Sequence, residues 1–169
     1  DLVENMLLAT KIENRSYSFP KESFNFSELV YKITDRLQVH SCGCEQIINA
    51  KIQPNLQLEG DKFALSSVVT NLIENAVKYS NPCDEINVLL DKVDGHIMLR
   101  VADKGPGISD AEKMLIFDKF YRVGNENVRK AKGTGLGLFI VKEVLQHHDA
   151  DIIVKDNQPQ GSIFEVTFS

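Results

Sequence analysis

DKFALSSVVTNLIENAVKYS, residues 61–80, carries a long helical pattern that decides how the rest of the chain can fold. Apolar residues recur at helical spacing along one side of it: Leu65, Val68, Val69, Leu72, Ile73 and Ala76. At 100° per residue, Asn71, Asn75 and Lys78 fall on the opposite side, within about 60° of one another. Asparagine is a mediocre helix former, so two amides one turn apart indicate a task for this face. The stretch predicts a helix from Asp61 to about Tyr79 with one core face and one polar face.

Composition restricts the classes of protein to which the chain can belong. It has 169 residues, of which 43% are apolar and 25% charged, which suits one soluble domain. The formal net charge of −5 offers no broad basic surface, so we expect no nucleic-acid partner. No apolar run approaches the roughly 20 residues that span a bilayer, and the N-terminus lacks a signal-peptide pattern. We therefore expect a soluble, cytoplasmic fragment, excised from a longer protein because it starts without Met.

The three cysteines, Cys42, Cys44 and Cys83, are too few for a disulfide framework. Together with His40 they could nominally supply four zinc ligands. Their spacing lacks the usual C-x₂₋₄-C form, however, and free thiols in a reducing compartment are the preferred interpretation.

The remaining elements follow from periodicity and turn residues. Residues 1–15 read as the end of a helix, and 16–25 as a linker that enters a first strand. Ser27 is expected to cap the next helix, whose inner face carries apolar residues. Strands are expected at 46–52, 56–58, 86–90, 96–102, 151–155 and 163–168, with hairpin turns at 94–95 and 159–161. A helix is expected from Gly135 to about His147.

This order of elements predicts an α+β fold. Hairpin strands alternate with helices that would cover only one face, so we expect a two-layer sandwich with a mixed, mainly antiparallel sheet. Residues 26–169 would form this domain. Residues 103–134 read as a long loop with one short amphipathic turn near Ala111 to Phe117. A loop of this length inside a compact domain is usually functional or disordered.

Two glycine-rich stretches could contact a ligand. DKGPGI, residues 103–108, ends a strand on an aspartate whose carboxylate could accept from an exocyclic amine such as that of adenine. The alternative is an ordinary Asp-Gly turn. KGTGLGL, residues 132–138, runs straight into a helix, where unpaired N–H groups suit phosphate. It matches neither a P-loop nor a dinucleotide fingerprint, and a flexible connector is the alternative.

Taken in order, the motifs are more specific than any one of them. They are Asn-x₃-Asn-Ala-x-Lys-Tyr-Ser from Asn71, Asp-x-Gly-x-Gly from Asp103, Phe117-x₂-Phe-Tyr-Arg, and Gly-Thr-Gly-Leu-Gly-Leu from Gly133. The series resembles the ATP-binding domain of bacterial sensor histidine kinases, in the superfamily of gyrase, heat-shock chaperone and mismatch-repair ATPases. The motifs correspond to its N, G1, F and G2 boxes. The resemblance covers residues 24–169 and implies a Bergerat-type fold that binds ATP and Mg²⁺.

The resemblance implies roles for individual residues. Asn75 and Asn71 would reach Mg²⁺ through amide oxygens, which are hard ligands suited to this ion. Lys78 would meet the phosphates and Tyr79 would lie near the adenine and ribose. Asp103 would bind the adenine amine. The remaining implied contacts are nucleotide contacts by Gly105, Gly107, Ile108, Gly133, Thr134, Gly135, Leu136 and Gly137, and stabilisation of γ-phosphate charge by Arg122.

The resemblance also separates kinase from hydrolase. Hydrolysing members carry a glutamate where this chain has Asn71, and an amide cannot act as a general base. Glu74 could assist proton transfer during phosphorylation. The alternatives are an ATPase or serine kinase of the same fold, which the missing base at position 71 disfavours, and a binding module without transferase activity, which the intact boxes disfavour.

The N-terminal LLATKIENRSYSF resembles the end of the dimerisation and phosphoacceptor hairpin of sensor kinases, so residues 1–15 are assigned to it. The implied partners are that domain of the parent kinase and, through the parent, a response regulator. The parent would be a homodimer, anchored in the inner membrane if it has a membrane anchor, and the fragment would be a monomer.

No histidine matches an acceptor motif, and His147 and His148 are expected to interact with a helix C-terminus. Phe117 and Phe120 are expected to anchor a lid, residues 108–133, by packing, with contact to the nucleotide as the alternative.

Overall fold

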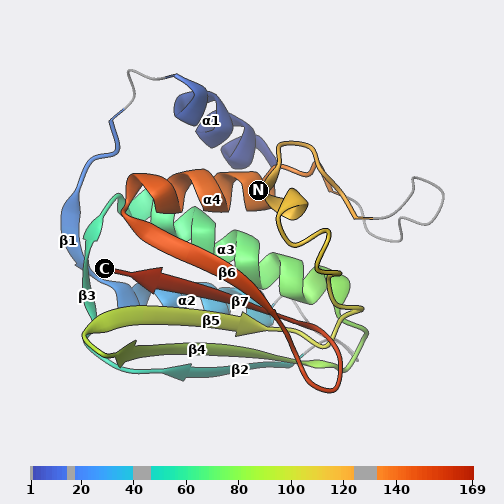
Figure 1. The fold of residues 1–169 in the computed structure, drawn as a ribbon. Coiled ribbons are helices and arrows are strands. Elements are labelled where there is room, and N and C mark those ends of the chain that lie inside the picture. Colours follow the sequence, from blue (N-terminus) through green and yellow to red (C-terminus); the bar gives the residue numbers. More distant parts are fainter. Residues whose placement is uncertain (1, 15–17, 40–46, 124–132) are drawn as a thin grey trace.

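A computed structural model describes residues 2–14, 18–39, 47–123 and 133–169. Its helices and strands follow in chain order (Figure 1). They are α1 (Leu2–Glu13), β1 (Glu22–Asn25), α2 (Phe26–Val39), β2 (Ile47–Ile52), β3 (Gln57–Gly60), α3 (Lys62–Tyr79), β4 (Glu85–Val93), β5 (His96–Ala102), the 3-10 turn η1 (Leu115–Phe117), α4 (Gly137–His147), β6 (Ala150–Asp156) and β7 (Ser162–Phe168).

The sheet is mixed and mainly antiparallel, as the sequence predicts. Five strands lie in the order β2-β4-β5-β7-β6, and only the β2–β4 pair is parallel. β1 and β3 form a separate antiparallel pair. The β4–β5 hairpin turns at Asp94 and Gly95, both of which have positive φ angles (51° and 89°), as a tight two-residue hairpin turn requires.

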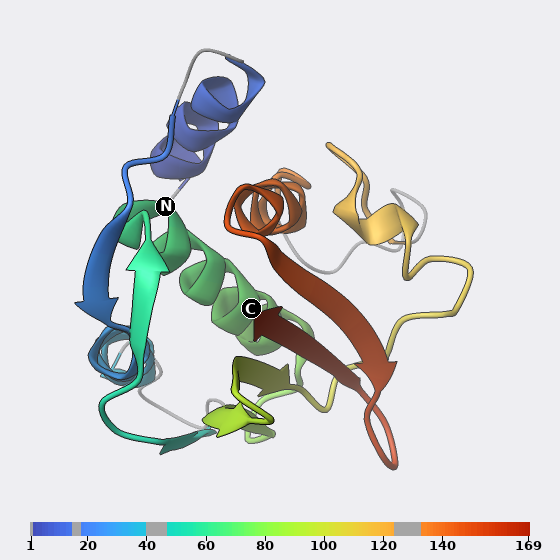
Figure 2. The ribbon, with the colours of Figure 1, turned by 60° about the vertical axis from the view of Figure 1, so that its left-hand side comes forward.

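Helices α3 and α4 lie together on one face of this sheet, which confirms the two-layer α+β sandwich (Figures 1 and 2). The apolar stripe of α3 is fully buried, and it meets alternating side chains of the strands: Ile86, Val88, Leu90, Leu99, Val101, Phe164 and Val166. Alternation along these strands thus sends these apolar side chains to the helices, while the other face carries polar and apolar side chains together, such as Glu165 and Ile153. The core sits between the two layers.

The N-terminus of α3 forms as predicted. Asp61 has an extended backbone and its Oδ1 accepts the N–H of Ala64 at 3.0 Å, which makes it the N-cap.

The expectation that Ser27 caps α2 is wrong. Asn25 receives the N–H of Glu28 at 3.0 Å, whereas the Ser27 hydroxyl donates to the carbonyl of Gln53 and accepts the N–H of Leu56. Ser27 is buried, and tertiary hydrogen bonds to the β2–β3 turn take its hydroxyl away from the helix end.

The C-terminus of α4 carries the two histidines. Each ring Nδ1 pairs with the carbonyl four residues earlier, Glu143 for His147 and Val144 for His148, which confirms the expected interaction with the last turn. His148 Nε2 also accepts the N–H of Asp61 at 2.9 Å. Burial lowers the pKa of His148, so the neutral ring joins the end of α4 to the start of α3.

Helix α1 packs against α4 rather than standing free (Figure 1). Leu8 and Ala9 are buried in the same core cluster as α3 and α4. Glu13 forms an ion pair with Lys119 of the loop that precedes α4. The apolar side chains of Val3, Met6 and Leu7 remain exposed on the other side of the helix.

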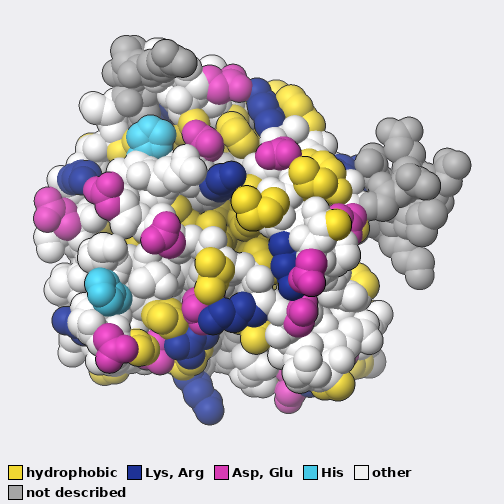
Figure 3. Space-filling model, in the orientation of Figure 1, with side chains coloured by type: hydrophobic (Ala, Val, Ile, Leu, Met, Phe, Trp, Pro, Cys, Tyr) yellow, Lys and Arg dark blue, Asp and Glu magenta, His cyan; other side chains and the backbone are white. Residues whose placement is uncertain are grey.

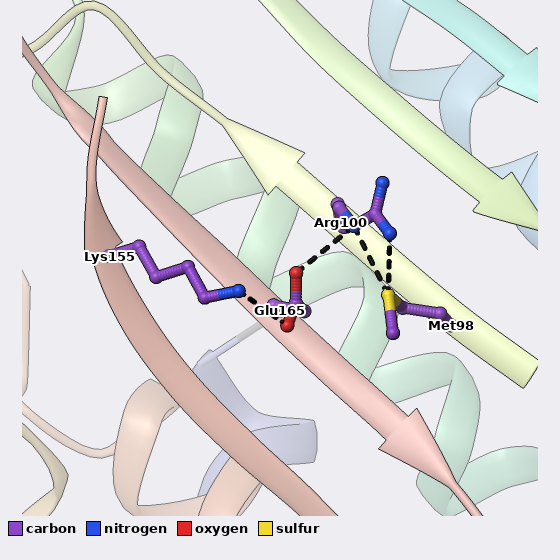
Figure 4. A network of polar contacts seen from close by, with 4 residues as sticks. All are labelled: Met98, Arg100, Lys155 and Glu165. Atoms are coloured by element: carbon purple, nitrogen blue, oxygen red, sulfur yellow. Dashed lines mark hydrogen bonds and ion pairs between the residues drawn. The ribbon is translucent and has the colours of Figure 1, made fainter. Parts of the chain in front are cut away.

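The outer face of the sheet carries a network of charged side chains (Figure 4). Glu165 on β7 accepts from Arg100 Nε on β5 at 3.0 Å and from Lys155 Nζ on β6 at 2.8 Å. Arg100 also reaches the sulfur of Met98. These contacts lower the pKa of Glu165, with the hydrogen bond from Lys155 as the largest cause. On the face seen in Figure 3, positive and negative side chains are interspersed around the hydrophobic ones.

Among the described residues, no helix combines the length and apolar character needed to cross a membrane. The nominal zinc ligands His40, Cys42 and Cys44 lie outside the described residues, and Cys83 is exposed. No cluster of three or more His, Cys, Asp or Glu side chains suited to a metal occurs within the described part of the chain.

Candidate functional site

The site begins with Asp103, which follows the last residue of β5 and is only 5% exposed. Its Oδ1 accepts the N–H of Gly105 at 2.8 Å and the N–H of Ser162 at 3.2 Å. Within the described part of the chain, both bonds go to Oδ1 and Oδ2 accepts none. Burial raises the pKa of Asp103, and the two backbone donors only partly offset that effect. The geometry presents one anchored oxygen and one oxygen free to accept from a ligand.

The loop after Asp103 lies directly against the end of α3. A Cβ on Gly105 would lie 2.8 Å from the main-chain oxygen of Tyr79, so only a glycine allows this approach. Pro106 is exposed, and Gly107 and Ile108 are half-buried, the latter packed at the edge of the core. The second and first sequence motifs therefore meet in space, as the resemblance implies.

The polar face of α3 leads from this loop toward the start of α4. Asn75 and Lys78 are half-buried, whereas Glu74 is exposed. The ammonium group of Lys78 lies 4.9 Å from the ring centroid of Tyr79 and directly beside the backbone of Gly133. A cation is thus placed between the first motif and the glycine-rich motif that precedes α4.

Asn71 differs from the expectation of an open polar face. It is 6% exposed and its amide forms a reciprocal pair with Asn5 of α1, at 3.1 and 3.2 Å. Its Nδ2 also donates to the carbonyl of Ser67. On the other side it touches α4, where a Cβ on Gly137 would lie 2.8 Å from Asn71 Oδ1. Helical periodicity places Asn71 away from the stripe of α3, but α1 and α4 cover that position.

The glycine-rich motif continues from Gly133 into α4. Thr134 is exposed, Gly135 is half-buried, and Leu136 is buried against the core. The helix begins at Gly137, two residues after the expected start, because Gly135 has a positive φ of 72° that a helix does not allow. The carbonyl of Gly135 accepts the N–H of Phe120, which connects this motif to the Phe-x₂-Phe motif.

The two phenylalanines of that motif have different surroundings. Phe117 is 7% exposed and packs in the core, as expected for a lid anchor. Phe120 does not pack in the core, since its ring is 63% exposed and its backbone is what contacts Gly135; for this residue nucleotide contact stays the prediction. Arg122 is half-buried two residues later. Residues 124–132 of the expected lid lie outside the described residues.

Sequence reasoning missed three residues that shape this site. Ser162 donates its N–H to Asp103, Asn157 Nδ2 donates to the carbonyl of Asp103 at 2.7 Å, and Gln160 Nε2 donates to the carbonyl of Gly105 at 2.9 Å. All three belong to the β6–β7 hairpin or its end. Their partners are more than 50 residues away, so no local pattern indicates the contacts.

The arrangement suits an adenine nucleotide. A buried carboxylate oxygen at one end can accept from an exocyclic amine, and glycines let a flat ring approach the backbone. At the other end Lys78, the amide of Asn75 and the loop before α4 offer the positive and hard-oxygen groups that a metal-bound polyphosphate requires. Residues of three motifs predicted to cooperate are thus contiguous in space.

Comparison with known families supports this interpretation. Residues 60–169 match the family described as "Histidine kinase-, DNA gyrase B-, and HSP90-like ATPase". The chain is 42% identical over 106 residues to Sensor protein CiaH of Streptococcus pneumoniae, covering 63% of this chain and 24% of CiaH. It is 32% identical over 165 residues to Sensor protein SrrB of Staphylococcus aureus, covering 96% of this chain and 28% of SrrB. The chain therefore spans about a quarter of the length of these relatives.

Solved structures show the same fold. A mycobacterial sensor histidine kinase, MprB, aligns with a TM-score of 0.73 at 30% identity, over 88% of this chain and 97% of that one. The structure of full-length ShkA in complex with AMPPNP aligns with a TM-score of 0.78 at 21% identity, over 99% of this chain and 35% of that one.

Proposed function

The chain belongs to the histidine kinase-, DNA gyrase B- and HSP90-like ATPase family and is a catalytic ATP-binding domain of the sensor-histidine-kinase type, and from this we propose that it binds Mg-ATP and transfers the γ-phosphoryl group to a histidine outside this chain. The observation that carries the proposal is Asp103, a buried carboxylate with one oxygen anchored and one open, beside the polar end of α3.

At the adenine end, Asp103 Oδ2 accepts the exocyclic amine. The charged carboxylate makes a stronger hydrogen bond than a neutral acceptor would. Burial raises the pKa of Asp103, and a bound base would lie in the same water-poor environment. Gly105 and Gly107 leave room for the ring, and Tyr79 at the end of α3 lies beside the same loop. Base recognition is therefore assigned to residues 103–107 and 79.

At the phosphate end, Asn75 is the proposed Mg²⁺ ligand. Its amide oxygen is a hard donor, and its half-buried position lies one turn before Lys78. When bound, Mg²⁺ would neutralise phosphate charge. Lys78 and the backbone N–H groups from Gly133 to Gly137 orient the triphosphate, and Arg122 faces the developing charge on the γ-phosphoryl. Glu74 is proposed to assist proton transfer.

Asn71 has a different status from Asn75. Its amide bonds Asn5 in this structure, so it can contact a metal only after that pair separates. As an amide it cannot activate water, which favours transfer to a protein over hydrolysis. The ATPase and serine-kinase alternatives are disfavoured for the same reason.

The proposed partners come from the parent protein. Residues 1–15 are assigned to the end of the dimerisation and phosphoacceptor domain, whose histidine would be the phosphoryl acceptor. A response regulator would receive the group next. Both partners would be reached in the cytoplasm by a homodimeric parent.

Calorimetric titration of Mg-ATP tests the binding half of the proposal. Asn75→Ala should weaken Mg-dependent ATP affinity at least about tenfold, because it removes one metal-ligand contact. A tenfold change in affinity corresponds to about 1.4 kcal/mol of binding free energy. The thermal midpoint should change little because Asn75 lies outside the buried stripe. Lys62→Ala, an exposed change at the far end of α3, is the matched control and should leave affinity unchanged. An Asn75→Ala variant that unfolds, or binds as wild type, would contradict the assignment.

Transfer is tested with γ-labelled ATP and a separately expressed phosphoacceptor hairpin from the same parent. The chain alone should bind ATP without labelling itself, and should label the hairpin slowly in trans, since the covalent link that raises effective concentration is missing. The label should be acid-labile, as a phosphohistidine is. Acid-stable label on the chain itself would favour the serine-kinase alternative, and ATP binding without any transfer would favour a binding module.

A further inference from the structure

We propose that Asn157 and Gln160, at the β6–β7 turn, are positioning residues that set the orientation of Asp103 toward the base. This proposal rests on the proposed function, because it assigns their role at the same adenine end. Neither residue reaches Asp103 Oδ2 itself. Both act through the backbone of the loop that carries it.

The contacts form a clamp on residues 103–105. Asn157 Nδ2 donates to the carbonyl of Asp103 at 2.7 Å, while its Oδ1 accepts the N–H of Gln158 at 3.0 Å. Gln160 Nε2 donates to the carbonyl of Gly105 at 2.9 Å. Two side chains of one turn, three positions apart in sequence, thus donate to carbonyls two residues apart, on either side of Lys104.

The backbone of the turn completes the clamp. Asp103 donates its N–H to the carbonyl of Ser162 at 2.9 Å, and Ser162 returns its N–H to Asp103 Oδ1. Gly161 has a φ of 118°, a conformation that side chains rarely allow, and a Cβ there would collide with the carbonyl oxygen of Asp103. The turn therefore lies against the loop at the residue that carries the carboxylate.

The chemistry of the two side chains fits this role. β5 ends at Ala102, so the loop beyond it has no regular ladder to fix its carbonyls. Amides can supply the missing donors without adding charge. A lysine or arginine in their place would pair with the carboxylate of Asp103 and compete with the amine of the base. Neutral donors position the loop and leave the charge for the ligand.

The experiment compares ATP with inosine triphosphate, which carries an oxo group where adenine carries its amine. Calorimetric affinities for both nucleotides with Mg²⁺ are measured on the full chain and on two variants. Asn157→Asp keeps the acceptor for Gln158 but replaces the donor to Asp103 by an oxygen. Gln160→Ala removes the donor to Gly105. Gln158→Ala changes an exposed residue of the same type in the same turn and is the matched control.

Each of the two variants should bind ATP about five- to tenfold more weakly, the effect of one lost hydrogen bond. Affinity for inosine triphosphate should change less, so the preference for ATP should fall, and exchange of the Gly105 amide hydrogen should accelerate. Gln158→Ala should match wild type.

Unchanged ATP affinity and preference in both variants would overturn the inference alone. So would equal losses for both nucleotides together with a lower thermal midpoint, since a purely structural role predicts that result. A wild-type chain that binds neither nucleotide would overturn the proposed function, and this inference with it.

Discussion

Two carboxylates of the same sheet have opposite surroundings: Asp103, just after the end of β5, and Glu165, on the outer face of β7. Asp103 is 5% exposed and Glu165 is 9% exposed, and both lie on or next to the central strands. Glu165 receives Lys155 and Arg100, and its pKa is lowered. Among the described residues, Asp103 receives two backbone N–H groups alone, and burial raises its pKa. The two groups differ in their partners, which are cations for Glu165 and backbone N–H groups for Asp103.

The difference separates a structural charge from a functional one. A carboxylate compensated by two cations has no need of a ligand, and its removal leaves those cations without an anion. A carboxylate with one oxygen still open carries a desolvation cost that a bound donor can offset. Carboxylates whose pKa is raised by burial gather at functional sites, which favours Asp103 over Glu165 as the ligand-binding group.

Exchanging Asp103 for asparagine should produce the largest effect. The side-chain oxygen can still accept from Gly105 and Ser162, but an N–H₂ group replaces Oδ2 and faces the adenine amine donor to donor. Affinity for Mg-ATP should fall about 100-fold or more, consistent with losing a charged hydrogen bond of about 1.5–3 kcal/mol and adding a clash of donors. The thermal midpoint should stay equal or rise, because a buried charge disappears. Titration calorimetry and thermal unfolding of the same sample measure both; a drop in midpoint without a loss of affinity would refute the assignment.

The same exchange at Glu165 should do the reverse. Glu165→Gln should lower the free energy of unfolding by about 1 kcal/mol, a moderate value because Lys155 and Arg100 are partly exposed and screened. ATP affinity should remain that of wild type. Urea unfolding gives the stability. If ATP affinity fell with stability intact, the outer face would have to be included in the site.

The smallest expected effect is the pH dependence of the free energy of unfolding, to which the two carboxylates contribute with opposite signs. The folded-state pKa of Glu165 is lowered, so its stabilisation is present above the unfolded value near 4.5 and is lost as pH falls through the folded pKa. The pKa of Asp103 is raised, so its stabilisation is present below 3.8 and is lost as pH rises through the folded pKa.

Urea unfolding from pH 7 to pH 3 should reveal both signs. The stability advantage of wild type over Glu165→Gln should shrink on acidification. Wild type should at the same time gain relative to Asp103→Asn. Parallel curves for all three proteins would show that neither carboxylate has a perturbed pKa.

Features that depend on neighbouring residues were predictable from the sequence. The start of α3 at Asp61, the Asp94-Gly95 turn and the apolar stripe of α3 each follow from local geometry, and the structure confirms them. The four motifs identified the family because their residue types and order are constrained together. The contiguity of Tyr79, Asp103 and Gly133 was implied only through that resemblance.

Features that depend on distant elements were not predictable. Ser27 is a good N-cap by type, yet its hydroxyl serves the β2–β3 turn. Asn71 lies on the polar side of α3 by periodicity, yet α1 covers it and pairs with it across 66 positions. Asn157 and Gln160 are ordinary turn residues until the fold brings their amides to the loop after β5.

The most direct test of the central claim, that Asp103 reads the base of ATP, is the nucleotide preference of Asp103→Asn. Mg-dependent affinities for ATP and inosine triphosphate should be measured by calorimetry on wild type and on the variant. Wild type should prefer ATP, because its carboxylate accepts the amine. In the variant the preference should vanish or invert, because the new N–H₂ group can donate to the oxo group of inosine. An identical ATP preference in both proteins would contradict the account.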